Sequence, residues 1–419
     1  MSEWKEVSLS ELGKTITGKT PSSQYPEDFG DEVPFITPSD SFEKKYISKS
    51  ERFLSRSGSE RLKDKIISSD SIMVTCIGSA MGKVAKNSLP SVTNQQINSI
   101  IVNEKFDSDY IYYLFKNNYA VFRNAASGST AIPILNKTDF DNLRFKVELD
   151  LNEQCKMVSI LSKIDDKIET NDQINQELEA MAKTLYDYWF VQFDYPDQNG
   201  KPYKSSGGKM VYHPELKREI PEGWGVAKVE DIAQTGSGGT PKSTNVSYYS
   251  NGEIPWINSG ELEQTVITST SNFITEEGLN NSSAKLFPSG TILVAMYGAT
   301  AGKVSFLTFE ASTNQAICAI MLTDIRMRYY LKNVIEDLYQ YLVKLSTGSA
   351  RDNLSQDMIK NIKVVIPSND ILDRFYDFSN NIIKEITKKQ QENEQLTQLR
   401  DWLLPMLMNG QVRVENYTD

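Results

Sequence analysis

Histidine and cysteine are scarce in this chain of 419 residues, which has one histidine and three cysteines. His213 stands alone, and Cys76, Cys155 and Cys318 lie far apart. Zinc sites use clustered cysteine and histidine ligands, so no metal site is expected. A Ser-His-Asp or Cys-His catalytic set would have to use His213, which lies in a stretch rich in glycine, lysine and proline, and we predict no such set.

Long apolar runs are also missing. No run of 18 apolar residues exists, and the first residues, MSEWKEVSLSELGK, show no apolar signal region. A sparse, odd number of cysteines fits reduced intracellular thiols better than a disulfide framework. These features predict a cytoplasmic protein with no membrane partner. A hydrophobic content of 39% and a charged content of 24% are enough for globular cores.

Motifs for catalysis are weak or absent. The segments Gly78–Lys83 and Gly298–Lys303 resemble phosphate-binding loops but have three residues between their glycines, and valine follows each lysine. A true loop of this kind has four residues there, and a serine or threonine follows the lysine to reach Mg²⁺. We interpret both as tight turns between strands that display one lysine. No glycine fingerprint of a dinucleotide fold, no Asn-Pro-Pro-aromatic motif and no deaminase cluster occurs, so we predict a non-catalytic chain with no catalytic residues.

The chain repeats itself at an offset near 220 residues. The matching segments are Trp4 with Trp224, 17–21 with 237–241, 32–36 with 253–257, 77–84 with 297–304, 93–96 with 313–316 and 127–129 with 347–349. A duplication is the simplest explanation, and self-similarity of this kind decides the architecture before any single motif does.

Each copy begins with about 150 residues of mixed character. The pattern predicts strands at 71–75 and 97–102, repeated at 291–295 and 317–322, and short helices at 110–117 and 328–334. The predicted segments are a globular domain at 1–150, a long helix at 151–193, a linker at 194–222, a second globular domain at 223–369 and a second long helix at 370–412.

Each copy ends in a long helix with a heptad stripe. Residues 153–190 contain no proline or glycine, and their rod would be about 57 Å long. The stripe residues predicted to pair the helices or dock partners are Ile164, Ile168, Leu178, Leu185, Trp189, Ile382, Ile386, Leu396, Leu403 and Leu407. We expect the two helices to form an antiparallel coiled coil, with the globular domains related by a pseudo-twofold axis. Asn171 and Asn175 fill the same stripe, where they either fix the register or lie on a solvated edge.

Charge is distributed unevenly. The net charge of −10 argues against nucleic acid, but −8 of it lies in residues 151–195 and 370–419. The globular segments 1–150 and 223–369 carry only −1 and −2, so each could present a basic face.

Several side chains of the globular domains suit DNA. Lysines beside the Gly-Thr-Pro loops could meet a phosphate, and the amides after Thr93 and Thr313 could pair with adenine. The stronger alternative for these amides is that they satisfy backbone groups at a strand start, because their recurrence in both copies indicates a shared structural task. For the hydroxyl-rich loops, phosphate contact and plain turn formation are equally open. The candidates are Lys19, Thr20, Lys83, Asn94, Gln95, Gln96, Ser129, Thr130, Lys137, Thr240, Lys242, Tyr297, Lys303, Asn314, Gln315, Ser349 and Arg351.

A family resemblance rests on three segments. They are the run 392–412, ENEQLTQLRDWLLPMLMNGQV, the helix end 178–190 with its Trp-Phe pair, and Ile-Pro-Glu-Gly-Trp at 220–224. With the duplication, they make the whole chain resemble the specificity subunit of Type I restriction–modification systems. The resemblance implies an α+β fold of two target-recognition domains joined by a long antiparallel two-helix coiled coil.

The resemblance also implies a role. Each recognition domain would bind one half of a bipartite double-stranded DNA target, and the helices would set the gap between the halves. Two methyltransferase (modification) subunits would dock on the helices and methylate adenine N6 with S-adenosylmethionine, and two restriction subunits could add ATP- and Mg²⁺-dependent translocation and cleavage. The chain itself would bind no cofactor. Two other functions stay open: a scaffold that binds proteins only, which the acidity favours, and a nucleotide-binding enzyme that uses the glycine loops.

Overall fold

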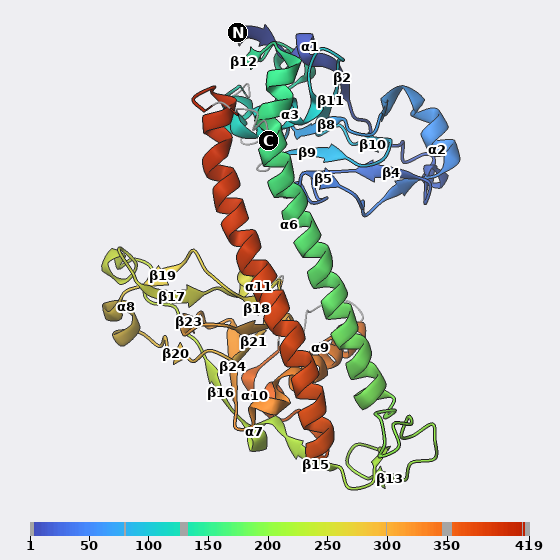
Figure 1. The fold of residues 1–419 in the computed structure, drawn as a ribbon, viewed down its shortest axis with the longest axis vertical. Helices are drawn as coiled ribbons and strands as arrows, with labels where there is room; N and C mark the ends of the chain where they lie inside the picture. The colour runs from blue at the N-terminus through green and yellow to red at the C-terminus, as the bar shows by residue number, and fades with distance from the viewer. Residues whose placement is uncertain are drawn as a thin grey trace, which may run out of the picture. The chain divides into compact units, whose positions relative to one another are not determined.

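The computed structural model describes residues 4–78, 81–125, 133–298, 300–345, 354–412 and 414, with the backbone alone at 340–345. It divides into two compact units (Figure 1). Unit 1 comprises Met1–Glu169 with Glu394–Asp419, and unit 2 comprises Thr170–Asn393. The boundary between the units therefore falls within both long helices, and each unit contains one globular domain with part of each helix.

Unit 1 contains three sheets. Strands β1 (Trp4–Ser8) and β12 (Arg144–Glu148) pair antiparallel, and they join the start of the domain to its end. A five-stranded sheet has the order β2 (Gly13–Thr17), β11 (Ile97–Val102), β8 (Ile72–Thr75), β9 (Val84–Asn87) and β5 (Tyr46–Ile47). The other has the order β3 (Phe29–Gly30), β6 (Phe53–Leu54), β4 (Val33–Ile36), β10 (Ser91–Thr93) and β7 (Ile66–Ile67). The helices of this domain are α1 (Leu9–Leu12), α2 (Arg56–Arg61), α3 (Ser108–Asn117), α4 (Tyr119–Asn124) and α5 (Lys137–Asp141).

Unit 2 repeats this topology with one short strand fewer. Strand β15 (Gly225–Lys228) pairs antiparallel with β25 (Lys363–Ile366). One sheet has the order β16 (Ala233–Ser237), β24 (Ile317–Leu322), β21 (Ile292–Ala295), β22 (Val304–Leu307) and β18 (Val266–Ile267). The other has the order β19 (Phe273–Ile274), β17 (Ile254–Ile257), β23 (Ala311–Thr313) and β20 (Leu286–Phe287). The helices are α7 (Val229–Ile232), α8 (Glu276–Asn280), α9 (Arg328–Leu345), which is longer than predicted, and α10 (Gln356–Lys360).

The central strands β8 and β21 are apolar at almost every position because they are buried on both faces. Helix α3 covers the first core with an unbroken run of buried residues from Tyr110 to Phe115. Its start is stabilised by Asp107, whose carboxylate accepts a hydrogen bond from the backbone N–H of Tyr110 at 2.8 Å.

The two long helices are α6 (Leu151–Tyr186), which ends in a π-helical turn at Asp187–Val191, and α11 (Asn369–Met408). They run antiparallel in both units, since residue numbers that rise on α6 meet falling numbers on α11. In unit 1, Arg400 reaches Asp165, and in unit 2 Asn171 reaches Asn393. The predicted fold class, an α+β protein with an antiparallel helix pair, is confirmed.

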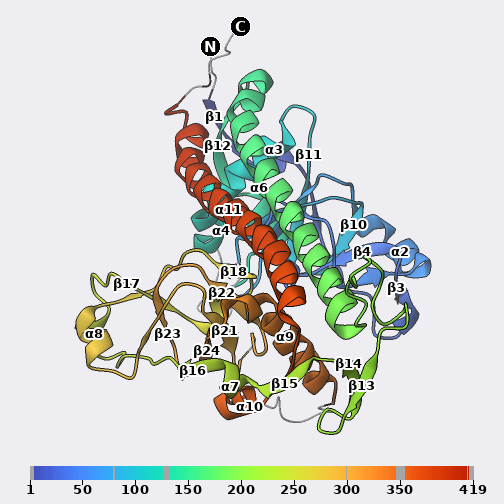
Figure 2. The same ribbon diagram turned by 60° about the horizontal axis from the view of Figure 1, so that its bottom comes forward.

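The segment predicted as a linker, 194–222, is folded within unit 2. It contains a hairpin of β13 (Met210–His213) and β14 (Arg218–Pro221), which follows the end of α6 in Figure 2. Tyr195 stacks on Trp224 with ring centroids 5.0 Å apart, and on Tyr203 at 4.7 Å. This aromatic packing buries Tyr195 against the second domain, although most of the segment is exposed and its glycines and prolines resemble those of an open connection.

Candidate nucleic-acid interface

The structure joins two loops that lie about 75 residues apart in the sequence. In unit 1, the backbone N–H of Lys19 donates to the carbonyl of Thr93 at 2.8 Å. The Thr20 hydroxyl donates to Oε1 of Gln95 at 2.6 Å. The Gly-Thr-Pro loop and the Thr-Asn-Gln loop therefore form one surface element, which we call the paired loops of the first domain.

Unit 2 builds the same element from the equivalent residues. The backbone N–H of Gly239 donates to the carbonyl of Thr313 at 2.8 Å, and the Thr240 hydroxyl donates to Oε1 of Gln315. Both loops were singled out from the sequence, but their pairing was not. One feature of the sequence could have indicated this pairing: the threonine and the glutamine both recur in the second copy at an offset of 220 residues.

Glycine is required where these loops touch. A Cβ atom at Gly18 would overlap the carbonyl oxygen of Asn94, and one at Gly238 would overlap the carbonyl oxygen of Thr313. The loops therefore pack backbone against backbone, so their geometry is independent of the exposed side chains that they carry.

The amide side chains divide into inward and outward groups. Asn94 is buried, and its Oδ1 accepts the backbone N–H of Gln96 at 3.0 Å while its Nδ2 donates to Oε1 of Gln96 at 3.1 Å. Asn314 repeats the first of these bonds with Ala316 at 3.1 Å. These contacts support the structural alternative for the asparagines and for Gln96.

Gln95 and Gln315 are the outward pair, since both are exposed. Each is held at Oε1 by a threonine of the neighbouring loop, and within the described residues no bond to its Nε2 group is found. An amide held in this way is ready to donate to an acceptor on a base edge.

Three candidate lysines remain unpaired within the described parts of the chain. Lys19, Lys242 and Lys303 are exposed, and no ion pair joins them to a described residue. Lys83, in contrast, lies 2.5 Å from Oε1 of Glu43, and Lys137 forms an ion pair with Asp141. Tyr297 is half-buried against the core of unit 2.

The glycine loops are strand turns, as their spacing predicts. Gly78 and Gly82 have φ of 85° and 89°, and they lie between the antiparallel strands β8 and β9. Gly298 and Gly302, with φ of 90° and 79°, lie between β21 and β22. A phosphate-binding loop needs a helix N-terminus directly after it, and a strand follows here.

Four candidates, Ser129, Thr130, Ser349 and Arg351, lie outside the described residues. None of the stripe residues on the helices is fully exposed. Ile164, Trp189, Ile382, Ile386 and Leu407 are buried, and the half-buried ones are Ile168, Leu178, Leu185, Leu396 and Leu403.

Sequence reasoning missed a buried ionic cluster in unit 1. Lys86, 1% exposed, places Nζ 2.5 Å from Asp109 and 2.6 Å from Asp70. Lys45 reaches the other oxygen of Asp109 at 2.6 Å, and the Ser162 hydroxyl of α6 donates to it at 2.8 Å. Burial alone would raise the pKa of Asp109, but the two ammonium groups outweigh it and hold that pKa at about 2.

A second charged pair lies in the helix seam itself. Arg400 of α11 donates to Asp165 of α6 at 2.8 Å, and their side chains are 13% and 9% exposed. The Tyr113 hydroxyl donates to the other oxygen of Asp165 at 2.5 Å. The cluster and this pair together tie the first globular domain to its part of the helix pair.

A polar layer crosses the seam in unit 2. The Asn171 side chain, fully buried, donates from Nδ2 to Asn393 Oδ1 at 2.8 Å and to Glu392 Oε2 at 3.0 Å. Asn393 in turn donates to Asp172 at 2.9 Å. Asn171 therefore lies inside the seam and not on a solvated edge, and Asn175, with its Oδ1 also buried, lies one turn further on.

Among the described residues, no three or more histidine, cysteine, aspartate or glutamate side chains are arranged to hold a metal ion. In the same part of the chain, no helix is long and apolar enough to cross a membrane.

A family model described as "Type I restriction modification DNA specificity domain" matches residues 1–180 and again 221–398. The chain belongs to this family, whose domain it carries twice. It is a non-catalytic specificity subunit of a Type I restriction–modification system, and the predicted role in DNA recognition is confirmed. Subunits of this kind act together with DNA and other subunits.

Relatives of known role support the assignment. The chain is 28% identical to the Type I restriction enzyme MjaIX specificity subunit of Methanocaldococcus jannaschii, over 99% of this chain and 94% of that one. It is 25% identical to the HindI specificity subunit of Haemophilus influenzae, over 98% and 100%. The crystal structure of a Type I S subunit from M. genitalium has the same fold, with a TM-score of 0.58, 16% identity and 97% and 96% coverage.

Proposed function

We propose that each globular domain reads one half of a bipartite DNA target through its paired loops. The observation that carries this proposal is that both domains build the same element, a threonine-held glutamine beside an exposed lysine. The glutamine amide can donate to an acceptor in the major groove, and the lysine can meet a phosphate. Different flanking residues on the same loop backbone would let the two domains recognise different half-site sequences.

We further propose that the helix pair sets the gap between the two halves and docks two modification subunits. Support comes from the charge distribution, since eight of the ten net negative charges lie in the segments that contain the helices. Acidic helices repel DNA phosphates and suit protein partners. S-adenosylmethionine, ATP and Mg²⁺ would be bound by those modification subunits and by restriction subunits, which can join the complex in a pair.

A domain replacement tests the reading of half-sites. A chain in which residues 223–369 are replaced by a second copy of residues 1–150 should direct methylation to a target with two identical half-sites in inverted orientation. The measurement is the methylated motif in cells that carry the replaced gene together with the modification subunit. A motif that keeps its original second half would contradict the proposal.

A heptad insertion tests the spacer. Seven residues added to both helices lengthen the pair by about 10 Å, or roughly three base pairs at 3.4 Å each. The methylated motif should keep both half-sites and widen its gap. An unchanged gap would refute the spacer role but leave half-site reading intact.

The net charge of −10 favours one competing function, a scaffold that binds only proteins. A gel-shift assay with the purified complex separates the two functions. Binding of DNA that is abolished jointly by Lys19→Ala and Lys242→Ala would exclude the scaffold, because those lysines lie on the globular domains and not on the helices.

A further inference from the structure

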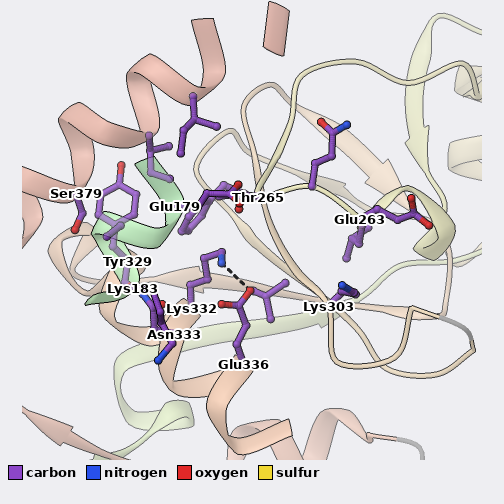
Figure 3. Close-up of a pocket in the computed structure, with 17 residues that line it drawn as sticks. Glu179, Lys183, Glu263, Thr265, Lys303, Tyr329, Lys332, Asn333, Glu336 and Ser379 are labelled. Atoms are coloured by element: carbon purple, nitrogen blue, oxygen red, sulfur yellow. Dashed lines mark hydrogen bonds and ion pairs between the residues drawn. The ribbon is translucent and has the colours of Figure 1, made fainter. Parts of the chain in front are cut away.

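A cavity of about 330 Å³ lies within unit 2, between the second globular domain and the helix pair (Figure 3). Its lining comes from α6, α9 and α11 and from residues around β18 and β22. Of its lining residues, only Lys303 and Ile386 belong to the features described above.

The duplication shows what occupies the same place in unit 1. At an offset of 220, Thr265, Phe306 and Tyr329 of the cavity correspond to Lys45, Lys86 and Asp109. At the offset of 218 that relates the helices, Ala182, Ser379 and Ile383 correspond to Arg400, Leu161 and Asp165. Six lining residues of the cavity are thus the counterparts of the buried ionic cluster, the seam pair and a buried leucine.

In unit 1 the crevice is closed by these residues. Lys45 and Lys86 both reach Asp109, Arg400 reaches Asp165, and Leu161 is fully buried. In unit 2 the long charged side chains are replaced by shorter or apolar ones. Three replacements reduce the side-chain volume most directly: Ala182 stands in place of an arginine, Thr265 in place of a lysine and Ser379 in place of a leucine. The cavity is the space that these shorter side chains leave.

The cavity is apolar in its interior and charged at its edge. Phe306, Tyr329 and Ile386 are buried, and they present two aromatic rings and an aliphatic chain. Ser379, only 2% exposed, has a buried hydroxyl with no hydrogen-bond partner among the described residues. A buried hydroxyl without a partner costs free energy, and a ligand with a hydrogen-bonding atom would remove that cost.

The edge carries mostly neutralised charge. Lys332 pairs with Glu336 at 2.6 Å, as the dashed line in Figure 3 shows. Lys183 pairs with Asp187 and lies 3.2 Å from Asp337. Lys303 has no ion pair with a described residue, but the lining holds three lysines and three glutamates, so it has no surplus of positive charge and favours a neutral ligand over an anion.

We propose that this cavity binds a small, uncharged heteroaromatic molecule, which packs against the contacting rings of Phe306 and Tyr329 and hydrogen-bonds to Ser379. Its volume lies in the range of small-molecule sites. A side chain of a docked subunit is the other possible occupant. Two identical subunits would find the cavity at one domain only, so a free ligand fits the asymmetry better.

Indole serves as the probe, because it is planar and uncharged and has one N–H donor for Ser379. Binding to the full chain, without DNA or other subunits, is measured by calorimetry and ligand-observed NMR. We expect saturable binding that weakens at least tenfold in Ala182→Leu and Ser379→Leu, which refill the space, and severalfold in Ser379→Ala. Thr184→Leu, an exposed position on the same helix, is the matched control and should bind as the unaltered chain does.

Three outcomes would overturn the proposal. They are no saturable binding to the unaltered chain, equal binding by the filled variants, and loss of binding whenever the modification subunits are present, which would assign the cavity to a partner's side chain. If Ser379→Leu fails to fold by circular dichroism, Ala182→Leu carries the test. Because DNA is absent from the assay, its result does not depend on whether the domains read half-sites.

Discussion

We expect the polar layer in the helix seam to affect both the stability of the helix pair and its register, and the two effects can be measured separately. Asn171 and Asn393 bond to each other across the seam at 2.8 Å, and each also bonds to a carboxylate of the opposite helix. A buried polar pair in a coiled coil typically costs stability and selects one register. We therefore expect the pair to behave as a unit when it is replaced by leucine.

The expected magnitudes follow from these bonds. Asn171→Leu removes two hydrogen bonds, worth about 1 kcal/mol each, and removes the donor that Asn171 supplies to the Asn393 carbonyl oxygen, at a further cost of about 1–3 kcal/mol. Burial of one leucine returns only about 2 kcal/mol, so the single variant should be destabilised by about 1–3 kcal/mol. In Asn171→Leu/Asn393→Leu, one buried and one half-buried leucine, together worth about 3 kcal/mol, offset three lost bonds, and the double variant should be about as stable as the unaltered chain.

The assay is urea unfolding followed by helical circular dichroism, together with the methylated motif in cells. Asn171→Leu should unfold at a lower urea concentration than the unaltered chain. The double variant should unfold at about the same concentration as the unaltered chain, and it should methylate targets with more than one gap. Asn175→Leu is the control, since no hydrogen bond joins Asn175 to another described residue. Destabilisation of the double variant by the sum of the two single effects would refute the reasoning, as would a single unchanged gap.

Three further predictions concern other parts of the chain. Gly302→Ala should lower the melting temperature far more than Gly298→Ala. Both glycines have positive φ, which costs an alanine about 1 kcal/mol, but only at Gly302 would the new Cβ overlap a tyrosine ring. Equal decreases in melting temperature would contradict this. The pKa of Asp109 is about 2, against the usual 3.8, so ionised Asp109 stabilises the fold fully above about pH 4 and this contribution is lost as the pH falls toward 2. Asp109→Asn should therefore remove on the order of 2 kcal/mol from the pH-dependent part of the unfolding free energy. An unchanged pH profile of unfolding would argue against the cluster. Lys19→Ala and Lys242→Ala should each lower the salt slope of DNA binding by about one, and a slope that stays constant would exclude a phosphate contact.

The sequence by itself determined the duplication, the central strands and the two long helices. The strands and helices depend on short-range periodicity, and the duplication depends on the similarity of two segments of the chain, so none of the three requires knowledge of tertiary contacts. The stripe from Ile164 to Trp189 predicts a helix with one apolar face, and the absence of proline and glycine in 153–190 lets the helix run through it. The repeat also places Gly18 and Gly238 in equivalent loops.

Only the tertiary structure decided which of these residues meet. Thr20 and Gln95 are 75 residues apart, and no local pattern specifies that the hydroxyl holds the amide. The segment 194–222 has the composition of a linker, but it folds because its aromatic residues find Trp224 and the second core. The crevice is closed in one domain and open in the other, because burial depends on the summed shapes of side chains from several distant segments, which only the folded chain brings together.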